Sequence, residues 1–219
     1  MTTAYIYAPL SGLAISLNCY CNRRWTSDVS FCSGSCPNGN CQCSGTLCRE
    51  NQNCATCASP CLCRNCCWHV ITQSGYQQPI DISGAAGTWL YAYMSAAIAS
   101  VKIIHVSGIC ASATGDINLG TILELYTGSN ATGSLIGRVL YAHLSNRQHS
   151  NGQVFNKSGA MPWFVSIGQV PSVPANQNCY LSTHVHMEAQ SGIGTVSRSP
   201  STCNGSLSAG TSVVYSWTY

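Results

Sequence analysis

Charged side chains are scarce in this sequence. Only 7% of its 219 residues are Asp, Glu, Lys or Arg, whereas about a quarter is usual in soluble domains. The net charge is +3, and the sequence contains no run of Lys or Arg. A basic patch for nucleic acid is therefore not expected, and we predict no nucleic-acid partner.

Long apolar runs and a secretory signal are also missing. No stretch approaches the roughly 18 apolar residues that indicate a membrane span. The first 18 residues are mildly apolar, but they lack the Lys/Arg-rich start and the small-residue cleavage site of a signal peptide. We expect no membrane span and no cleaved signal peptide. Because no G-x-S-x-G motif occurs, nothing supports a serine nucleophile.

Cysteine, in contrast, is abundant. Thirteen of the 16 cysteines fall between Cys19 and Cys67, whereas Cys110, Cys179 and Cys203 are spread over the rest. Such a number indicates a disulfide framework formed in an oxidising place. After Phe31 this predicted module, residues 1–68, has almost no aliphatic side chains, so cross-links must hold it together. Its C-x-C and C-x-x-C pairs leave a metal-loaded module open as an alternative.

The larger predicted domain, residues 69–219, is typical of a mainly β fold. Several segments are rich in β-branched and aromatic residues and partly alternate, and Gly and Asn clusters separate them. The predicted strands are 89–93, 101–106, 121–126, 138–144, 180–188 and 211–219. The five tryptophans are interpreted as packing residues rather than as a sugar-binding platform.

One short segment combines residues that can carry chemistry. Residues 183–188 read Thr-His-Val-His-Met-Glu. In a strand, residues i and i+2 face the same side, so His184, His186 and Glu188 share a face while Val185 and Met187 point to the other. Two adjacent imidazoles suit a metal site or acid–base chemistry. A pair of surface histidines on an edge strand is the alternative.

Further segments place this pair in a longer pattern. Residues 77–82 read Gln-Gln-Pro-Ile-Asp-Ile, a Gly-Thr turn follows at 87–88, and residues 141–145 read Tyr-Ala-His-Leu-Ser. Over residues 70–190 this order resembles the LytM-like, or lysostaphin-type, zinc endopeptidases. In that family an H-x-G-x-D segment precedes a Gly-Thr turn, then Y-A-H-L, then H-x-H-x-E. The resemblance implies an antiparallel β fold with a groove over one sheet.

The resemblance also implies roles for single residues. Asp81 and His186 match the family's carboxylate and histidine zinc ligands. His143 and His184 match its two histidines that do not bind the metal but handle the water and the charged intermediate. Zinc with three protein ligands keeps one position for water and lowers its pKa to about 7.

One position departs from the family pattern. Gln77 stands where the family has its first zinc-ligand histidine, and Pro79 replaces the glycine between that ligand and the aspartate. An amide oxygen is a poorer zinc ligand than imidazole. Three outcomes follow: Gln77 still ligates a weaker site, another histidine (His69, His105 or His149) replaces it, or the domain is free of metal and inactive.

The expected function is zinc-dependent cleavage of peptide cross-links in bacterial peptidoglycan. Peptidoglycan peptides are the expected partners, and Zn²⁺ is the expected cofactor. An extracellular or virion-associated place, such as a phage tail tip, reconciles many cysteines with the absent signal peptide. The alternative is a catalytically inactive LytM-like subunit that binds the cell wall or helps to build a virion or another extracellular assembly.

Overall fold

The computed structural model of the chain describes residues 1–14, 42–43, 46–47, 75–109, 119–173, 183–199 and 206–219. Within these ranges the protein consists of β strands and one 3-10 turn, η5 (Ser129–Ala131). The prediction of a mainly β fold with antiparallel sheets is confirmed. None of the described segments contains a helix that is long and apolar enough to cross a membrane.

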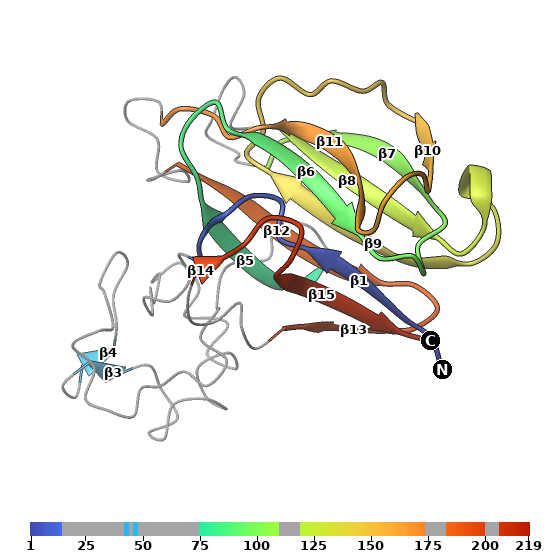
Figure 1. Cartoon of the computed structure of the whole chain (residues 1–219). Coiled ribbons are helices and arrows are strands. Elements are labelled where there is room, and N and C mark those ends of the chain that lie inside the picture. The colour runs from blue at the N-terminus through green and yellow to red at the C-terminus, as the bar shows by residue number, and fades with distance from the viewer. Residues whose placement is uncertain (15–41, 44–45, 48–74, 110–118, 174–182, 200–205) are drawn as a thin grey trace.

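A six-stranded antiparallel sheet carries the predicted histidines (Figure 1). Its strands, in spatial order, are β10 (Val154–Asn156), β7 (Ser100–Ser107), β8 (Leu119–Tyr126), β9 (Leu135–Ala142), β12 (His184–Ser191) and β5 (Gln77–Ser83). The strands predicted at 101–106, 121–126 and 138–144 are β7, β8 and β9. They form a meander because each pairs with the next along the chain, and the β8–β9 pairing has one irregularity between Leu125 and Tyr126.

A five-stranded antiparallel sheet forms the second layer (Figure 1). Its order is β11 (Trp163–Gln169), β6 (Trp89–Met94), β1 (Thr3–Tyr7), β15 (Val213–Thr218) and β13 (Thr195–Arg198). Two small pairs complete the strands, β2 (Gly12–Leu13) with β14 (Ser206–Leu207) and β3 (Gln42–Cys43) with β4 (Thr46–Leu47).

The first strand lies in a sheet with strands of the predicted larger domain, although the predicted boundary at residue 68 assigned it to the cysteine-rich module. β1 pairs with β15 on one side and with β6 on the other, so it lies in the middle of the five-stranded sheet. Its alternation explains this position, because Ala4 and Ile6 are fully buried while Tyr5 is exposed. All cysteines except Cys43 lie outside the described residues, so the disulfide framework stays a prediction.

The two sheets enclose one apolar core. Alternate residues of each strand enter it, including Leu90 and Met94 from β6 and Val185 and Met187 from β12. The described tryptophans Trp163 and Trp217 are buried, as expected for packing residues, and Trp89 is half-buried.

Polar bonds tie the sheets together at β12. The Tyr215 hydroxyl donates to the Met187 carbonyl (3.0 Å), and the Trp217 indole donates to the Gln190 carbonyl (3.1 Å). Any side chain at Gly137 would collide with that indole nitrogen. The absence of a side chain at Gly137 therefore allows Trp217 of β15 to bond to β12, the strand that carries the predicted histidines.

Candidate active site on the outer face of the six-stranded sheet

The structure brings four of the five predicted site residues together. His186 on β12 lies opposite Asp81 on β5, and on its other side it pairs with Ala142 at the end of β9. His143 follows β9 directly, and His184 precedes His186 by two residues on β12. Because Val185 and Met187 enter the core, the histidines of β12 face outward, as the i, i+2 pattern predicted.

His186 lies between two carboxylates. Its Nδ1 is 2.8 Å from Asp81 Oδ1, and its Nε2 is 2.7 Å from Glu188 Oε1. The ring and the Glu188 side chain are fully buried. Burial alone lowers the pKa of His186, but the bonds with both carboxylates and their negative charge outweigh it and raise the pKa to about 9. The protonated imidazole is therefore the stable form while both carboxylates are ionised and no metal replaces a proton.

The other two histidines stand beside this pair. His184 Nε2 is 3.7 Å from Asp81 Oδ2. The His143 ring centroid is 5.1 Å from that of His184 and 6.0 Å from that of His186, with edge-on orientations. His143 has a left-handed backbone with φ of 58°, which costs about 1 kcal/mol or more in a non-glycine residue. This conformation ends β9 and sets the direction in which the His143 ring leaves the backbone.

Gln77 lies apart from this cluster because β5 contains an irregularity. Asp81 pairs with His186 and Ile80 with Met187, but Ala189 pairs with Gln77 instead of residue 78. One extra residue in β5 shifts the alternation of side chains. Gln77 therefore shares a face with Ala189 and not with Asp81, and its amide nitrogen donates to the Ser191 hydroxyl (3.3 Å). That Gln77 ligates a metal stays a prediction.

The histidines considered as replacements for Gln77 are also distant where they are described. His105 lies on β7 and pairs with Thr121 on β8, and both β8 and β9 lie between β7 and β12. The His149 ring packs on Phe155 with centroids 4.5 Å apart, and its Nε2 is 3.2 Å from the Ser166 hydroxyl. His69 lies outside the described residues.

The donor types suit zinc, but the described ligand set is short of one member. A zinc ion takes carboxylate oxygen and imidazole nitrogen at about 2.0–2.2 Å. Asp81 Oδ1 and His186 Nδ1 are 2.8 Å apart, so both atoms could bind one ion if they moved slightly apart. Glu188 on the other nitrogen matches the carboxylate that commonly orients a metal-bound histidine. Among the described residues, however, no group of three or more His, Cys, Asp or Glu side chains is arranged to hold a metal ion.

Two features near the cluster were not assigned a role from the sequence. Glu188 was placed on the histidine face, but its burial against His186 depends on neighbouring strands. Next to it lies an apolar band on the same outer face, which consists of Tyr76, Ile109, Ile122, Leu140 and Ala142. Its members come from four separate segments, so only pairing of the strands could reveal it.

A polar network continues beyond the band. Arg138 donates from Nε (2.9 Å) and Nη2 (2.8 Å) to Glu124 Oε1, and from Nη1 to the Gln190 side chain (2.9 Å). The Tyr126 hydroxyl donates to Glu124 Oε2 (2.8 Å). Burial raises the pKa of Glu124, but the bonds from Tyr126 and Arg138 outweigh it, so the pKa lies below its usual value.

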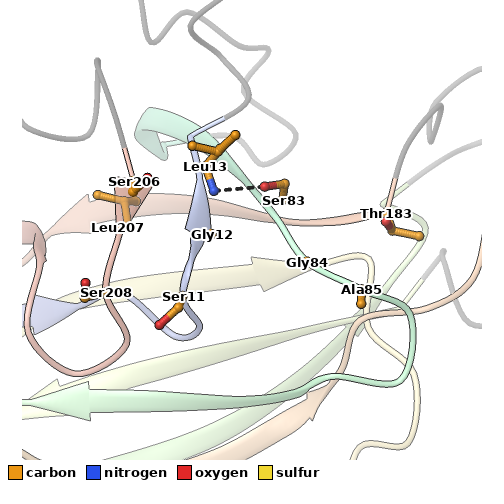
Figure 2. A pocket seen from close by; sticks show the side chains of 10 residues that line it. All are labelled: Ser11, Gly12, Leu13, Ser83, Gly84, Ala85, Thr183, Ser206, Leu207 and Ser208. Carbon is orange, nitrogen blue, oxygen red and sulfur yellow. Dashed lines mark hydrogen bonds between the residues drawn. The ribbon is translucent and has the colours of Figure 1, made fainter.

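An open pocket lies beside Thr183, the residue that precedes His184 (Figure 2). Segments 11–13, 83–85 and 206–208 line it together with Thr183, and apart from Leu13 and Leu207 the lining residues are small or bear a hydroxyl group. Ser83 pairs with His184 and accepts a hydrogen bond from the Leu13 backbone (2.9 Å). None of these lining residues carries a charged side chain, so the pocket suits a neutral ligand.

No protein family, curated protein or solved structure matches this chain. The sequence motifs and the geometry of the cluster therefore indicate its function. That geometry unites Asp81, His143, His184 and His186 from three strands, with Glu188 behind His186.

Proposed function

We propose that this protein is a lysostaphin-type endopeptidase that cleaves peptide cross-links of bacterial peptidoglycan with the aid of zinc. The convergence of Asp81, His143, His184 and His186 on one outer face carries the proposal. These residues are far apart in the sequence, and three strands must pair in register to bring them together. The low charge and the many cysteines support an extracellular or virion-associated place of action.

The residues of the chain divide the work as follows. Asp81 and His186 hold the metal, which when bound supplies a Lewis acid and a water of lowered pKa. Glu188 orients His186 through its second ring nitrogen. His184 and His143 stand beside the Asp81–His186 pair, where a neutral imidazole can accept a proton from water and return it to the departing amine. The pocket beside Ser83 and Thr183 receives the neutral peptide.

The number of strong ligands determines how tightly the proposed enzyme binds zinc. With two strong ligands on the described face, zinc binds weakly unless His69 or another donor joins them. His186 would have to lose its Nδ1 proton before it could act as a ligand, and its raised pKa opposes that loss at neutral pH. Activity should therefore rise with added zinc and with pH.

One observation favours a second candidate function. His186 is fully buried and bonded on both nitrogens, and Gln77 faces away from Asp81. Such a network is complete without a metal ion. In this alternative the cluster only stabilises the fold, and the protein is a wall-binding or structural subunit of a virion or extracellular assembly.

Zinc content and peptidoglycan digestion distinguish the two functions. The wild type should bind up to one zinc per chain and release new amino termini from peptidoglycan. The His186→Ala variant should lose both properties, and the His184→Ala variant should lose digestion but retain zinc. His105→Ala is the matched control, because His105 lies on the same sheet away from the cluster. Absence of zinc binding and digestion over a range of zinc concentrations would leave the structural alternative.

A further inference from the structure

The outer face of the five-stranded sheet carries a group of aromatic side chains. On β6 the even-numbered residues Leu90, Ala92 and Met94 are fully buried, so the odd-numbered ones face outward. The same alternation on β1 and β11 turns further rings to this side. We call this group the aromatic face, and it consists of Tyr5, Tyr7, Trp89, Tyr91, Tyr93 and Phe164.

Several of these rings touch their neighbours across strands. Phe164 on β11 packs edge-on against Tyr91 with centroids 5.4 Å apart, and its ring is tilted against that of Tyr93 with centroids 5.5 Å apart. Tyr91 and Tyr93 are 6.0 Å apart, and Tyr5 and Tyr7 are 6.3 Å apart. Tyr7 pairs with Tyr93 in the sheet, so the two groups of rings lie on three adjacent strands.

These rings are accessible. Phe164 is 58% exposed and Tyr5 is 36% exposed, while Tyr7, Tyr91 and Tyr93 are half-buried. Grouped aromatic side chains at a surface lose hydrophobic stabilisation that burial would provide, and such patches commonly mark binding sites. In this sheet Trp163 and Val165, the sequence neighbours of Phe164, fill the core. The exposed ring is therefore not needed to complete the core.

The chemistry of the face selects the kind of ligand. Most outward residues beside the rings in the five described strands bear hydroxyl groups, as at Thr3, Thr195, Ser197, Ser216 and Thr218. Val213 and Gln169, which pair with Tyr7 and Trp89, do not. The Ser166 hydroxyl donates to the Gln148 side chain (2.8 Å). None of the outward-facing residues of these strands carries a charged side chain. Nucleic acid needs cationic contacts to phosphate, and an acidic or basic polymer would find no opposite charge here.

A neutral sugar chain matches both the aromatic rings and the hydroxyl groups of this surface. One side of a pyranose ring presents C–H groups, which are weakly positive and apolar and suit the negative face of an aromatic ring. Its edge carries hydroxyl groups, which can bond to the tyrosine, serine and threonine hydroxyls of the sheet. We propose that the aromatic face binds a neutral polysaccharide, with Phe164 and Tyr91 as its central contacts. This inference is independent of the proposed peptidase site, which lies on the other sheet.

Calorimetry with defined sugars tests the proposal. Chitohexaose, cellohexaose and maltohexaose are titrated into the full-length protein, and at least one should bind. The Phe164→Ala and Tyr91→Ala variants should each weaken that binding at least tenfold. Val154→Ala is the matched control, because Val154 is also exposed (36%) but lies on β10 of the other sheet, and it should bind like the wild type.

Two outcomes would overturn the proposal. Either none of the three sugars binds at millimolar concentration, or binding is the same in the wild type and in both face variants. Sedimentation velocity provides an independent reading of the same face. A dimer that Phe164→Ala dissociates would show that a second copy of the chain, and not a sugar, covers it. Urea unfolding of each variant verifies that lost binding does not reflect an unfolded chain.

Discussion

The two outer faces of this sandwich use the same pleated backbone for opposite kinds of chemistry. On the six-stranded sheet, ionisable side chains are buried and bonded to each other, as in the contacts of His186 with Asp81 and Glu188. On the five-stranded sheet, exposed rings stand among hydroxyl groups. The difference shows that the fold fixes which positions face outward, while the residue types at those positions decide what each face can bind.

The largest expected effect is on the free energy of unfolding, and it distinguishes the core residue Trp163 from Phe164 of the aromatic face. Trp163→Ala should lower the free energy of unfolding by about 3–5 kcal/mol, because it removes a buried indole that donates to the Ile98 carbonyl (3.1 Å). Phe164→Ala, at the next residue, should cost less than about 1 kcal/mol. Urea unfolding measures both. Similar losses in the two variants would mean that the aromatic face is part of the core.

A large effect is also expected at the buried carboxylate of the other face. Glu188→Ala should destabilise the protein by about 3 kcal/mol, because it leaves a buried imidazole nitrogen without its partner. Glu188→Gln keeps an acceptor oxygen and should lose less. Thermal or urea unfolding of the two variants, in the presence of a chelator, measures the difference. Equal losses would indicate that the charge of Glu188, and not its hydrogen bond, stabilises His186.

A smaller effect concerns acid stability. The pKa of Glu124 is lower in the folded protein than its usual value of 4.5. Its contribution is therefore present above about pH 4.5 and is lost as the pH falls through the lowered pKa, and it amounts to about 1 kcal/mol or less. Urea midpoints at pH 7 and pH 3 measure this contribution in the wild type and in Glu124→Gln. The difference in urea midpoint between the wild type and Glu124→Gln should be smaller at pH 3 than at pH 7. A larger difference at pH 3 would contradict the role of Glu124.

The smallest expected effect is at Gln77. Restoring the family's histidine with Gln77→His should leave zinc affinity unchanged, because the irregularity in β5 turns position 77 away from Asp81. Zinc titration followed by elemental analysis compares the variant with the wild type. A clear gain in affinity would show that this end of β5 changes register when a metal binds.

Periodicity in the sequence was enough to predict much of the fold. The strands expected at 89–93, 101–106 and 121–126 agree with β6, β7 and β8 within two residues at each end. β1 and β11 were not predicted. β1 belongs to a stretch whose composition is only mildly apolar, and β11 contains an irregularity near Gly168 where its pairing with β6 shifts. Their place in the sheet depends on distant partners, which a local pattern does not contain.

The alternation of side chains predicted the candidate site correctly on β12. It failed on β5, which contains an extra residue. The i, i+2 spacing correctly placed His184, His186 and Glu188 on one face. The i, i+4 spacing of Gln77 and Asp81 also suggests one face in a regular strand, but the extra residue in β5 reverses it. Whether the cluster holds zinc and cleaves peptides stays a prediction.

The arrangement of two packed sheets has a consequence for any ligand larger than a single chain segment. Stacked sheets lie only about 10 Å apart, yet their outer side chains point in opposite directions, so one straight polymer strand cannot touch both faces. In a cross-linked mesh, a protein held by a sugar strand on one side would present its histidine cluster to a neighbouring strand on the other. Attachment would then raise the local concentration of cross-links at the cluster without competing for it. The protein would then lie between layers of the mesh and would reach cross-links without moving along one strand.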